Sequence, residues 1–138
     1  MNFNNFFKEK KILITGASKG LGWVCAKTFE SWGSKLVITG RSLDKLIKLQ
    51  NSFTKPNEHL AFSADLLNLS EIHSLVDRSN EFLGEVNIII HTAGGGYGFR
   101  DPLLSWEQFE KLHRINLGSA AEINRLMIPH MLKKKKEV

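Results

Sequence analysis

A glycine-rich turn near the start of the chain has the residues that a phosphate site needs. It reads Thr15-Gly-Ala-Ser-Lys-Gly-Leu-Gly22 and lies between a short apolar run and a helical pattern. Glycines there let backbone N–H groups approach a pyrophosphate, and the first turn of the helix offers unpaired donors and a favourable dipole. A plain strand-to-helix turn would not need three glycines. The position therefore favours a dinucleotide site over a tight turn.

The end of the second apolar run indicates which dinucleotide would fit. Folds that bind NAD place an Asp or Glu there for the ribose hydroxyls, but no acidic residue occurs between Glu30 and Asp44. Arg41 follows Thr39-Gly40 instead, and Lys19 lies within the glycine turn. Two cations at this point suit a 2′-phosphate, so the sequence favours NADP over NAD. The alternative is that both are solvated surface residues.

Other polar side chains give weaker signals. Asn116 falls on the apolar stripe of a predicted helix, where an unpaired amide would cost about 1–3 kcal/mol, so backbone or a functional group must satisfy it. His91 ends an apolar run, and a histidine bonded to backbone is favoured there over an acid–base role. Cys25 is expected in the core. The five histidines and one cysteine show no metal-ligand spacing.

Short apolar runs alternate with helical periods, which is typical of a parallel sheet covered by helices. The predicted strands are Lys11–Thr15, Lys35–Thr39, His59–Ser63 and Val86–His91, the last one buried on both faces. The predicted helices run from Leu21 to a stop at Gly33, from the cap Ser42, from Ser70, and from the capping box Ser105-Trp-Glu-Gln108 towards Pro129. The apolar stripe of the last helix is Phe109, Leu112, Asn116, Leu117, Ala120, Ile123 and Met127. Right-handed crossovers turn this order into an α/β doubly wound parallel sheet.

Composition excludes several classes of protein. The chain has 138 residues, of which 42% are hydrophobic, as expected for one globular domain. Its net charge of +5 comes mostly from the run Lys133–Lys136, so no distributed basic face for nucleic acid is expected. No apolar run is long enough to predict a membrane span, and the N-terminus lacks the pattern of a signal peptide, so a cytoplasmic location is expected.

Four ordered motifs resemble those of the short-chain dehydrogenase/reductase family in its typical form. Thr15 with the Gly-x-x-x-Gly-x-Gly spacing resembles the cofactor signature of that family. Asp65-Leu66 looks like its adenine-ring contact, and Asn116 looks like its helical asparagine, which holds a water in a proton relay. His91-Thr-Ala-Gly94 is similar to its N-N-A-G motif, with both asparagines replaced but Ala93 and Gly94 kept.

The resemblance implies a Rossmann-type fold with four strands in the order 3-2-1-4, and hydride transfer between NADP(H) and a small carbonyl or alcohol substrate. It implies a catalytic role for Asn116 and no metal. The predicted cofactor-binding residues are Gly16, Ser18, Lys19, Gly20, Leu21, Gly22, Arg41, Asp65, Leu66, Ala93 and Gly94.

The family's catalytic Tyr-x-x-x-Lys is missing from the sequence. The only tyrosine, Tyr97, is followed four residues later by Asp101 and is expected on the substrate-side loop Gly94–Phe99, or as a partly exposed loop aromatic. We therefore expect residues 1–138 to form a single domain that is truncated before the fifth strand of the family and inactive alone. Because its sheet edge would be bare, we expect it to self-associate as a homo-oligomer or to be only marginally folded. The alternative is a non-catalytic module that senses nucleotides or binds a partner.

Overall fold

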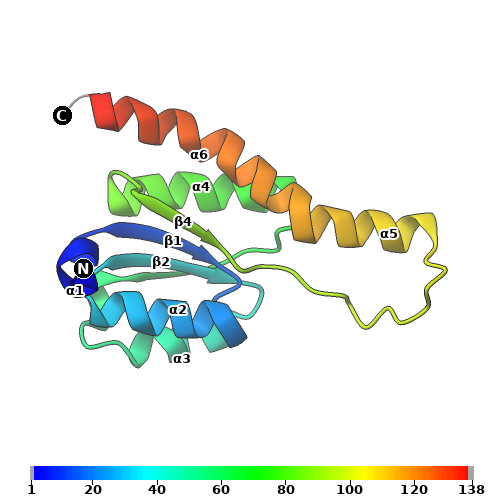
Figure 1. The fold of residues 1–138 in the computed structure, drawn as a ribbon, viewed down its shortest axis with the longest axis horizontal. Coiled ribbons are helices and arrows are strands. Elements are labelled where there is room, and N and C mark those ends of the chain that lie inside the picture. The colour runs from blue at the N-terminus through cyan, green and yellow to red at the C-terminus, as the bar shows by residue number, and fades with distance from the viewer. Residues whose placement is uncertain (1, 137–138) are drawn as a thin grey trace.

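A four-stranded parallel sheet lies at the centre of the structure, a computed structural model that describes residues 2–136 (Figure 1). Its strands are β1 (Lys11–Thr15), β2 (Lys35–Gly40), β3 (Leu60–Ser63) and β4 (Ile88–His91). They lie in the order β3-β2-β1-β4, and each neighbouring pair is parallel. This confirms the predicted α/β doubly wound fold of Rossmann type and its 3-2-1-4 strand order.

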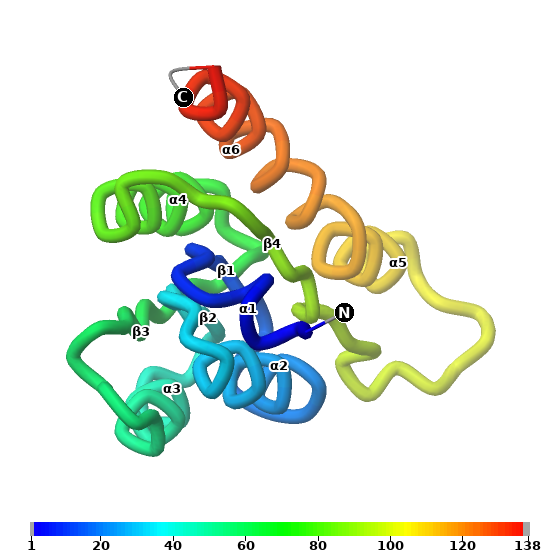
Figure 2. The backbone as a smooth tube through the Cα atoms, turned by 60° about the vertical axis from the view of Figure 1, so that its left-hand side comes forward, coloured from blue at the N-terminus to red at the C-terminus, as the bar shows by residue number. Residues whose placement is uncertain are grey.

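Helices cover both faces of the sheet (Figures 1 and 2). On one face lie α2 (Gly20–Ser31) and α3 (Leu43–Asn51), and on the other lie α4 (Leu69–Leu83) and a long helical segment made of α5 (Trp106–His113), the π-helical turn η2 (Arg114–Gly118) and α6 (Ser119–Lys136). Successive strand residues point to opposite faces, so Ile12 and Ile14 pack towards α2 and α3 while Leu13 packs towards α4 and α6. Both faces need apolar residues, which explains the unbroken apolar runs of the strands.

A short N-terminal helix, α1 (Phe3–Phe7), was not predicted. Five residues are too few to show a helical period, and tertiary contacts hold this turn. The ring of Phe7 lies 4.9 Å from that of Phe29 and 5.3 Å from that of Trp32. The hydroxyl of Ser34 also donates a hydrogen bond to the carbonyl of Phe7. The aromatic rings therefore pack α1 against the end of α2.

Helix α2 approaches the sheet through small residues. Gly22 and Ala26 are its buried residues, whereas Leu21 and Val24, which the apolar pattern placed on the inner face, are exposed. The prediction of a core Cys25 is also wrong, because its side chain is only half-buried. A close approach of helix to strand is the role expected of the last glycine in a dinucleotide turn.

The long helical segment differs from its predicted apolar stripe. Its buried residues follow one another at four-residue steps: Ile115, Ser119, Ile123 and Met127. Three residues of the predicted stripe are exposed: Phe109, Asn116 and Leu117. Phe109 lies in α5, and Asn116 and Leu117 lie in the π-helical turn η2, whereas Ile123 and Met127 of α6 are buried as predicted. Pro129 lies inside α6 and does not end it.

Strand β4 is shorter and less buried than expected. Ile88 and Ile90 pack towards α2 and Ile89 towards α4, but all three are only part-buried, so the expectation of full burial is wrong. The reason is its place in the order of strands: within residues 2–136, β4 pairs with β1 alone.

Among residues 2–136, no helix is long and apolar enough to cross a bilayer.

We expect the stability of the fold to fall in acid because of a buried histidine before β3. The Nδ1 atom of His59 accepts a hydrogen bond of 3.1 Å from the backbone N–H of Leu36, and burial lowers the pKa of His59 from its ordinary value of 6.5. Because the pKa of His59 is lower in the folded chain, the unfolded chain takes up the proton at a higher pH than the folded chain does. The free energy of unfolding should therefore fall as the pH drops below about 6.5. Above that pH His59 should contribute no slope.

Denaturant unfolding between pH 5 and pH 8 tests this prediction. His59→Gln keeps an oxygen that can accept from Leu36 but cannot titrate, so its pH slope should be flatter than that of the wild type. His113→Gln, at an exposed position of α5, is the control and should keep the wild-type slope. Equal slopes in all three proteins would contradict the assignment.

Candidate functional site

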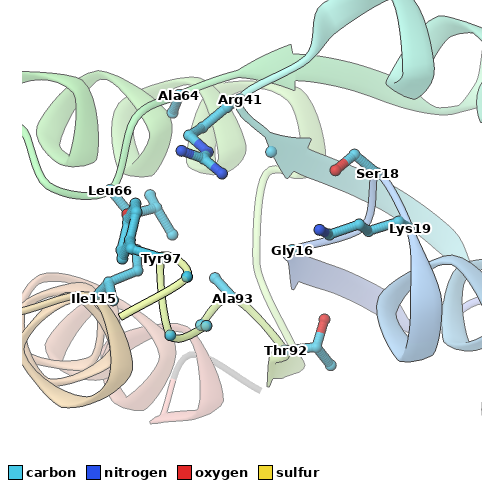
Figure 3. Close-up of a pocket in the computed structure, with 15 residues that line it drawn as sticks. Gly16, Ser18, Lys19, Arg41, Ala64, Leu66, Thr92, Ala93, Tyr97 and Ile115 are labelled. Carbon is cyan, nitrogen blue, oxygen red and sulfur yellow. The ribbon is translucent and has the colours of Figure 1, made fainter. Parts of the chain in front are cut away.

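A pocket of about 330 Å³ opens where the strands end (Figure 3). Its walls are the turn after β1, the end of β2, the loops after β3 and β4, and Ile115 of η2. From β1 the chain forms β2 and β3 on one side of the sheet and then crosses to form β4 on the other side of β1. Open α/β sheets bind ligands at this reversal, outside the carboxyl ends of the strands.

Most of the predicted site residues line this pocket, but not all. Those that do are Gly16, Ser18, Lys19, Arg41, Leu66, Ala93 and Gly94. Those outside the lining are Gly20, Leu21, Gly22, Asp65 and Asn116. Lining residues that were not among the predicted cofactor contacts are Gly40, Ala64, Thr92, Gly95, Gly96, Tyr97, Gly98 and Ile115. Most of the missed residues belong to the loop after β4, which has no periodic pattern to read.

The glycine turn is packed directly against the loop after β4. Gly16 has a φ of +68°, and a Cβ added there would lie 2.6 Å from the backbone nitrogen of Ala93. A Cβ on Gly22 would collide with the carbonyl oxygen of Gly16 and the hydroxyl of Thr92. The side chain of Thr15 accepts a hydrogen bond from the N–H of Ala93 at 3.3 Å, which ties the two loops together. Only glycine at positions 16 and 22 allows this contact.

Helix α2 begins beside the pocket, since its N-cap residue, Lys19, is one of the lining residues. Lys19 is its N-cap residue and makes no capping hydrogen bond through its side chain, and the first turn of α2 contains no acidic residue. The first N–H groups of the helix therefore have no side-chain acceptor. An anion placed here would meet both these donors and the positive end of the helix dipole.

Two cations reach into the pocket from different walls, Lys19 from the glycine turn and Arg41 from the end of β2 (Figure 3). The backbone of Arg41 is fixed by the hydroxyl of Ser63, which donates to its carbonyl at 3.0 Å. Among the described residues, neither cation forms an ion pair, and no Asp or Glu lines the pocket. The walls thus carry uncompensated positive charge.

Asn116 holds the loop after β4 in place. Its Oδ1 accepts from the N–H of Gly95 at 3.0 Å, and its Nδ2 donates to the carbonyls of Gly95 and Leu112, both at 2.9 Å. Backbone groups therefore satisfy the side-chain amide of Asn116, which was one of the two possibilities that the sequence left open. The prediction that Asn116 is buried is wrong, because the residue is exposed. A Cβ on Gly94 would lie 2.6 Å from the same Oδ1, so a larger residue there would require the amide of Asn116 to shift.

Two predicted polar residues turn away from the pocket. The carboxylate of Asp65 accepts from the N–H of Leu67 at 3.0 Å, which shapes its own loop and presents Leu66 to the pocket. The Nε2 of His91 lies 2.9 Å from Oδ1 of Asn124 on α6, so a side-chain amide satisfies it rather than backbone. No group of three His, Cys, Asp or Glu residues that could hold a metal occurs among residues 2–136.

Comparison with known proteins agrees with this geometry. Residues 10–137 match the family model described as short chain dehydrogenase. The NADPH-dependent pterin aldehyde reductase of Arabidopsis thaliana is 29% identical over 136 residues, which are 98% of this chain and 56% of that protein. A 7α-hydroxysteroid dehydrogenase structure with NADH and 7-oxo-glycochenodeoxycholic acid superposes with a TM-score of 0.86 at 26% identity, over 97% of this chain and 53% of that one.

A 3-ketoacyl-(acyl-carrier-protein) reductase from Brucella melitensis, solved with NADH, superposes with a TM-score of 0.85 at 25% identity. The aligned region covers 95% of this chain and 54% of that one. The chain spans about half the length of the curated relatives it matches. Among these relatives, the pterin aldehyde reductase is named as NADPH-dependent, and the two solved structures contain NADH.

Proposed function

The chain belongs to the short-chain dehydrogenase/reductase family, and we propose that it forms the NADP-binding part of an oxidoreductase acting on a carbonyl or alcohol substrate. The observation that carries the choice of NADP is the pair of unpaired cations, Lys19 and Arg41, in a pocket without acidic residues. A 2′-phosphate would neutralise them, whereas the ribose hydroxyls of NAD would find no carboxylate. We further propose that residues 1–138 act as one nucleotide-binding domain.

The predicted residues that line the pocket, together with Asp65, would take the following roles in this proposal. The backbone of the glycine turn, whose Gly16, Ser18 and Lys19 line the pocket, and the first turn of α2 would hold the pyrophosphate. Leu66 and Ile115 offer an apolar wall for the adenine, and Asp65 positions Leu66. Ala93 and Gly94 would lie along the ribose and nicotinamide side.

The bound dinucleotide would supply the hydride, and the protein must supply a proton to the substrate oxygen. Tyr97 is the only tyrosine of the chain, and the residue four positions after it is Asp101, so the 138 residues contain no Tyr-x-x-x-Lys. We therefore propose that the 138 residues bind the cofactor without turnover. In a complete active site Asn116 would hold the relay water, in addition to fixing Gly95. The lack of the tyrosine–lysine pair in these residues is also the observation that favours the second candidate, a non-catalytic module that senses nucleotides.

Titration of the purified chain with NADP⁺ and with NAD⁺ tests the proposal. NADP⁺ should bind more tightly, and Arg41→Ala should lower its affinity by about 1–3 kcal/mol, or roughly 5- to 150-fold, with little effect on NAD⁺. Lys48→Ala, which removes an exposed cation of α3 outside the pocket, is the control and should leave both affinities unchanged. Equal or undetectable binding of the two dinucleotides would refute the NADP assignment. Steady oxidation of NADPH with a carbonyl compound would refute the lack of turnover.

A further inference from the structure

The loop after β4 carries a bulky residue in a backbone conformation that favours glycine. Tyr97 has a φ of +52° and is flanked by Gly96 and Gly98. Left-handed backbone is rare for a large side chain and persists only where the surroundings compensate for it. A fourth consecutive glycine would relieve the strain, so the contacts of the Tyr97 ring must hold it there.

The ring of Tyr97 lies against two cations from different elements. Nζ of Lys111, on α5, is 4.1 Å from the ring centroid, and Cζ of Arg41, after β2, is 5.5 Å from it. Both distances are within the range of cation–π attraction. The ring also packs against the core cluster on the α4 side of the sheet and lines the pocket together with Arg41. Tyr97 thus lies in the pocket, beside Arg41.

The two cations on this ring have no acidic partner. Within residues 2–136, neither Arg41 nor Lys111 takes part in an ion pair. Two like charges beside one ring repel each other, and an anion with several acceptor oxygens placed between them would replace that repulsion by attraction. Lys19 and Arg41 line the pocket, whereas Lys111 lies outside its lining and contacts the ring of Tyr97, which is part of that lining.

We propose that Tyr97 is a specificity-determining residue that positions Arg41 and Lys111 as a clamp for the 2′-phosphate of NADP. The proposal rests on the NADP binding proposed above, and it adds Lys111 as a phosphate-binding residue. Tyr97 acts through the cations and not on the base, so it should affect only the dinucleotide that carries the phosphate.

The test is a set of affinities for NADP⁺ and NAD⁺ in the 138-residue chain. Tyr97→Ala and Tyr97→Gly should each weaken NADP⁺ binding about three- to tenfold and leave NAD⁺ binding within about twofold, while Tyr97→Phe keeps the ring and should match the wild type. Lys111→Met should show the same selective loss. In an Arg41→Ala, Lys111→Met background, Tyr97→Ala should have no further effect, because the ring has no cation left to position.

Controls separate the alternatives. Leu103→Ala, at a position of the same loop that is 85% exposed, should bind like the wild type, and thermal melts establish that each variant is folded. An equal loss of NADP⁺ and NAD⁺ in Tyr97→Ala would overturn the proposal, since the ring would then contact the shared adenine. Wild-type affinity in Tyr97→Gly would overturn it as well. If the wild type itself does not prefer NADP⁺, the proposed function fails before any variant of Tyr97 is measured.

Discussion

Replacing Gly16 by alanine is expected to abolish dinucleotide binding and to destabilise the chain, whereas the same change at Gly20 should have a much smaller effect. Both glycines have left-handed backbone, with φ of +68° at Gly16 and +58° at Gly20. An alanine in that conformation costs about 1–2 kcal/mol at either position. Only at Gly16 would the new Cβ also lie 2.6 Å from the backbone nitrogen of Ala93, while nothing lies within 4 Å of a Cβ on Gly20.

The extra contact makes the difference because backbone cannot move aside as a flexible side chain does. Overpacking of this kind adds about 1–3 kcal/mol to the loss of stability. It also pushes the glycine turn away from the loop after β4, so the two walls that face the dinucleotide separate. At Gly22 the backbone is not left-handed, but a new Cβ would collide with Gly16 and Thr92. Gly22→Ala should therefore lose stability through this collision alone, without the cost of placing alanine in left-handed backbone.

Thermal unfolding and NADP⁺ titration of the three alanine variants measure both effects. We expect the order of stability to be wild type, then Gly20→Ala, then Gly16→Ala, with binding lost in Gly16→Ala and Gly22→Ala but retained in Gly20→Ala. If Gly16→Ala and Gly20→Ala are equally stable and bind equally well, the close contact between the two loops does not exist in solution.

Sequence alone was enough to place the glycine turn and Arg41 at one site. Each follows a strand that its apolar run identifies, and the carboxyl ends of parallel strands lie at one edge of the sheet. Short-range patterns and the right-handed crossover rule therefore predicted the doubly wound parallel sheet and the main walls of the pocket, while the strand order 3-2-1-4 followed from the family resemblance. Neither step needed knowledge of side-chain packing.

The loop after β4 could not be predicted in this way. Its run of glycines has no period, so nothing in it shows that Tyr97 adopts a positive φ or turns towards Arg41. The contact with Lys111 joins two positions that no motif relates. The exposure of Asn116 was also missed, and this residue lies in a π-helical turn that no breaker residue in the sequence marks.

The sheet edge and the outer face of the long helix have a consequence for the state of the chain in solution. Ile88, Ile89 and Ile90 form the edge strand of the described sheet with no charge or proline among them, which is the pattern that templates another strand. On α6, Ile128 and Leu132 are exposed by 44% and 56%. Both features favour contacts between copies of the chain.

We therefore expect light scattering to show self-association that increases with protein concentration, and a thermal transition that rises with NADP⁺ because the ligand binds only the folded state. The gain should be about 2.7 kcal/mol when free NADP⁺ reaches 100 times its Kd. The double variant Ile128→Glu, Leu132→Glu separates the two surfaces, and Lys48→Glu on α3 is its control because it changes the net charge equally. Association that persists in the double variant assigns the contact to β4, and its loss assigns the contact to α6. A compact monomer with a sharp transition that NADP⁺ does not shift would contradict both the exposed-edge argument and the linkage to binding.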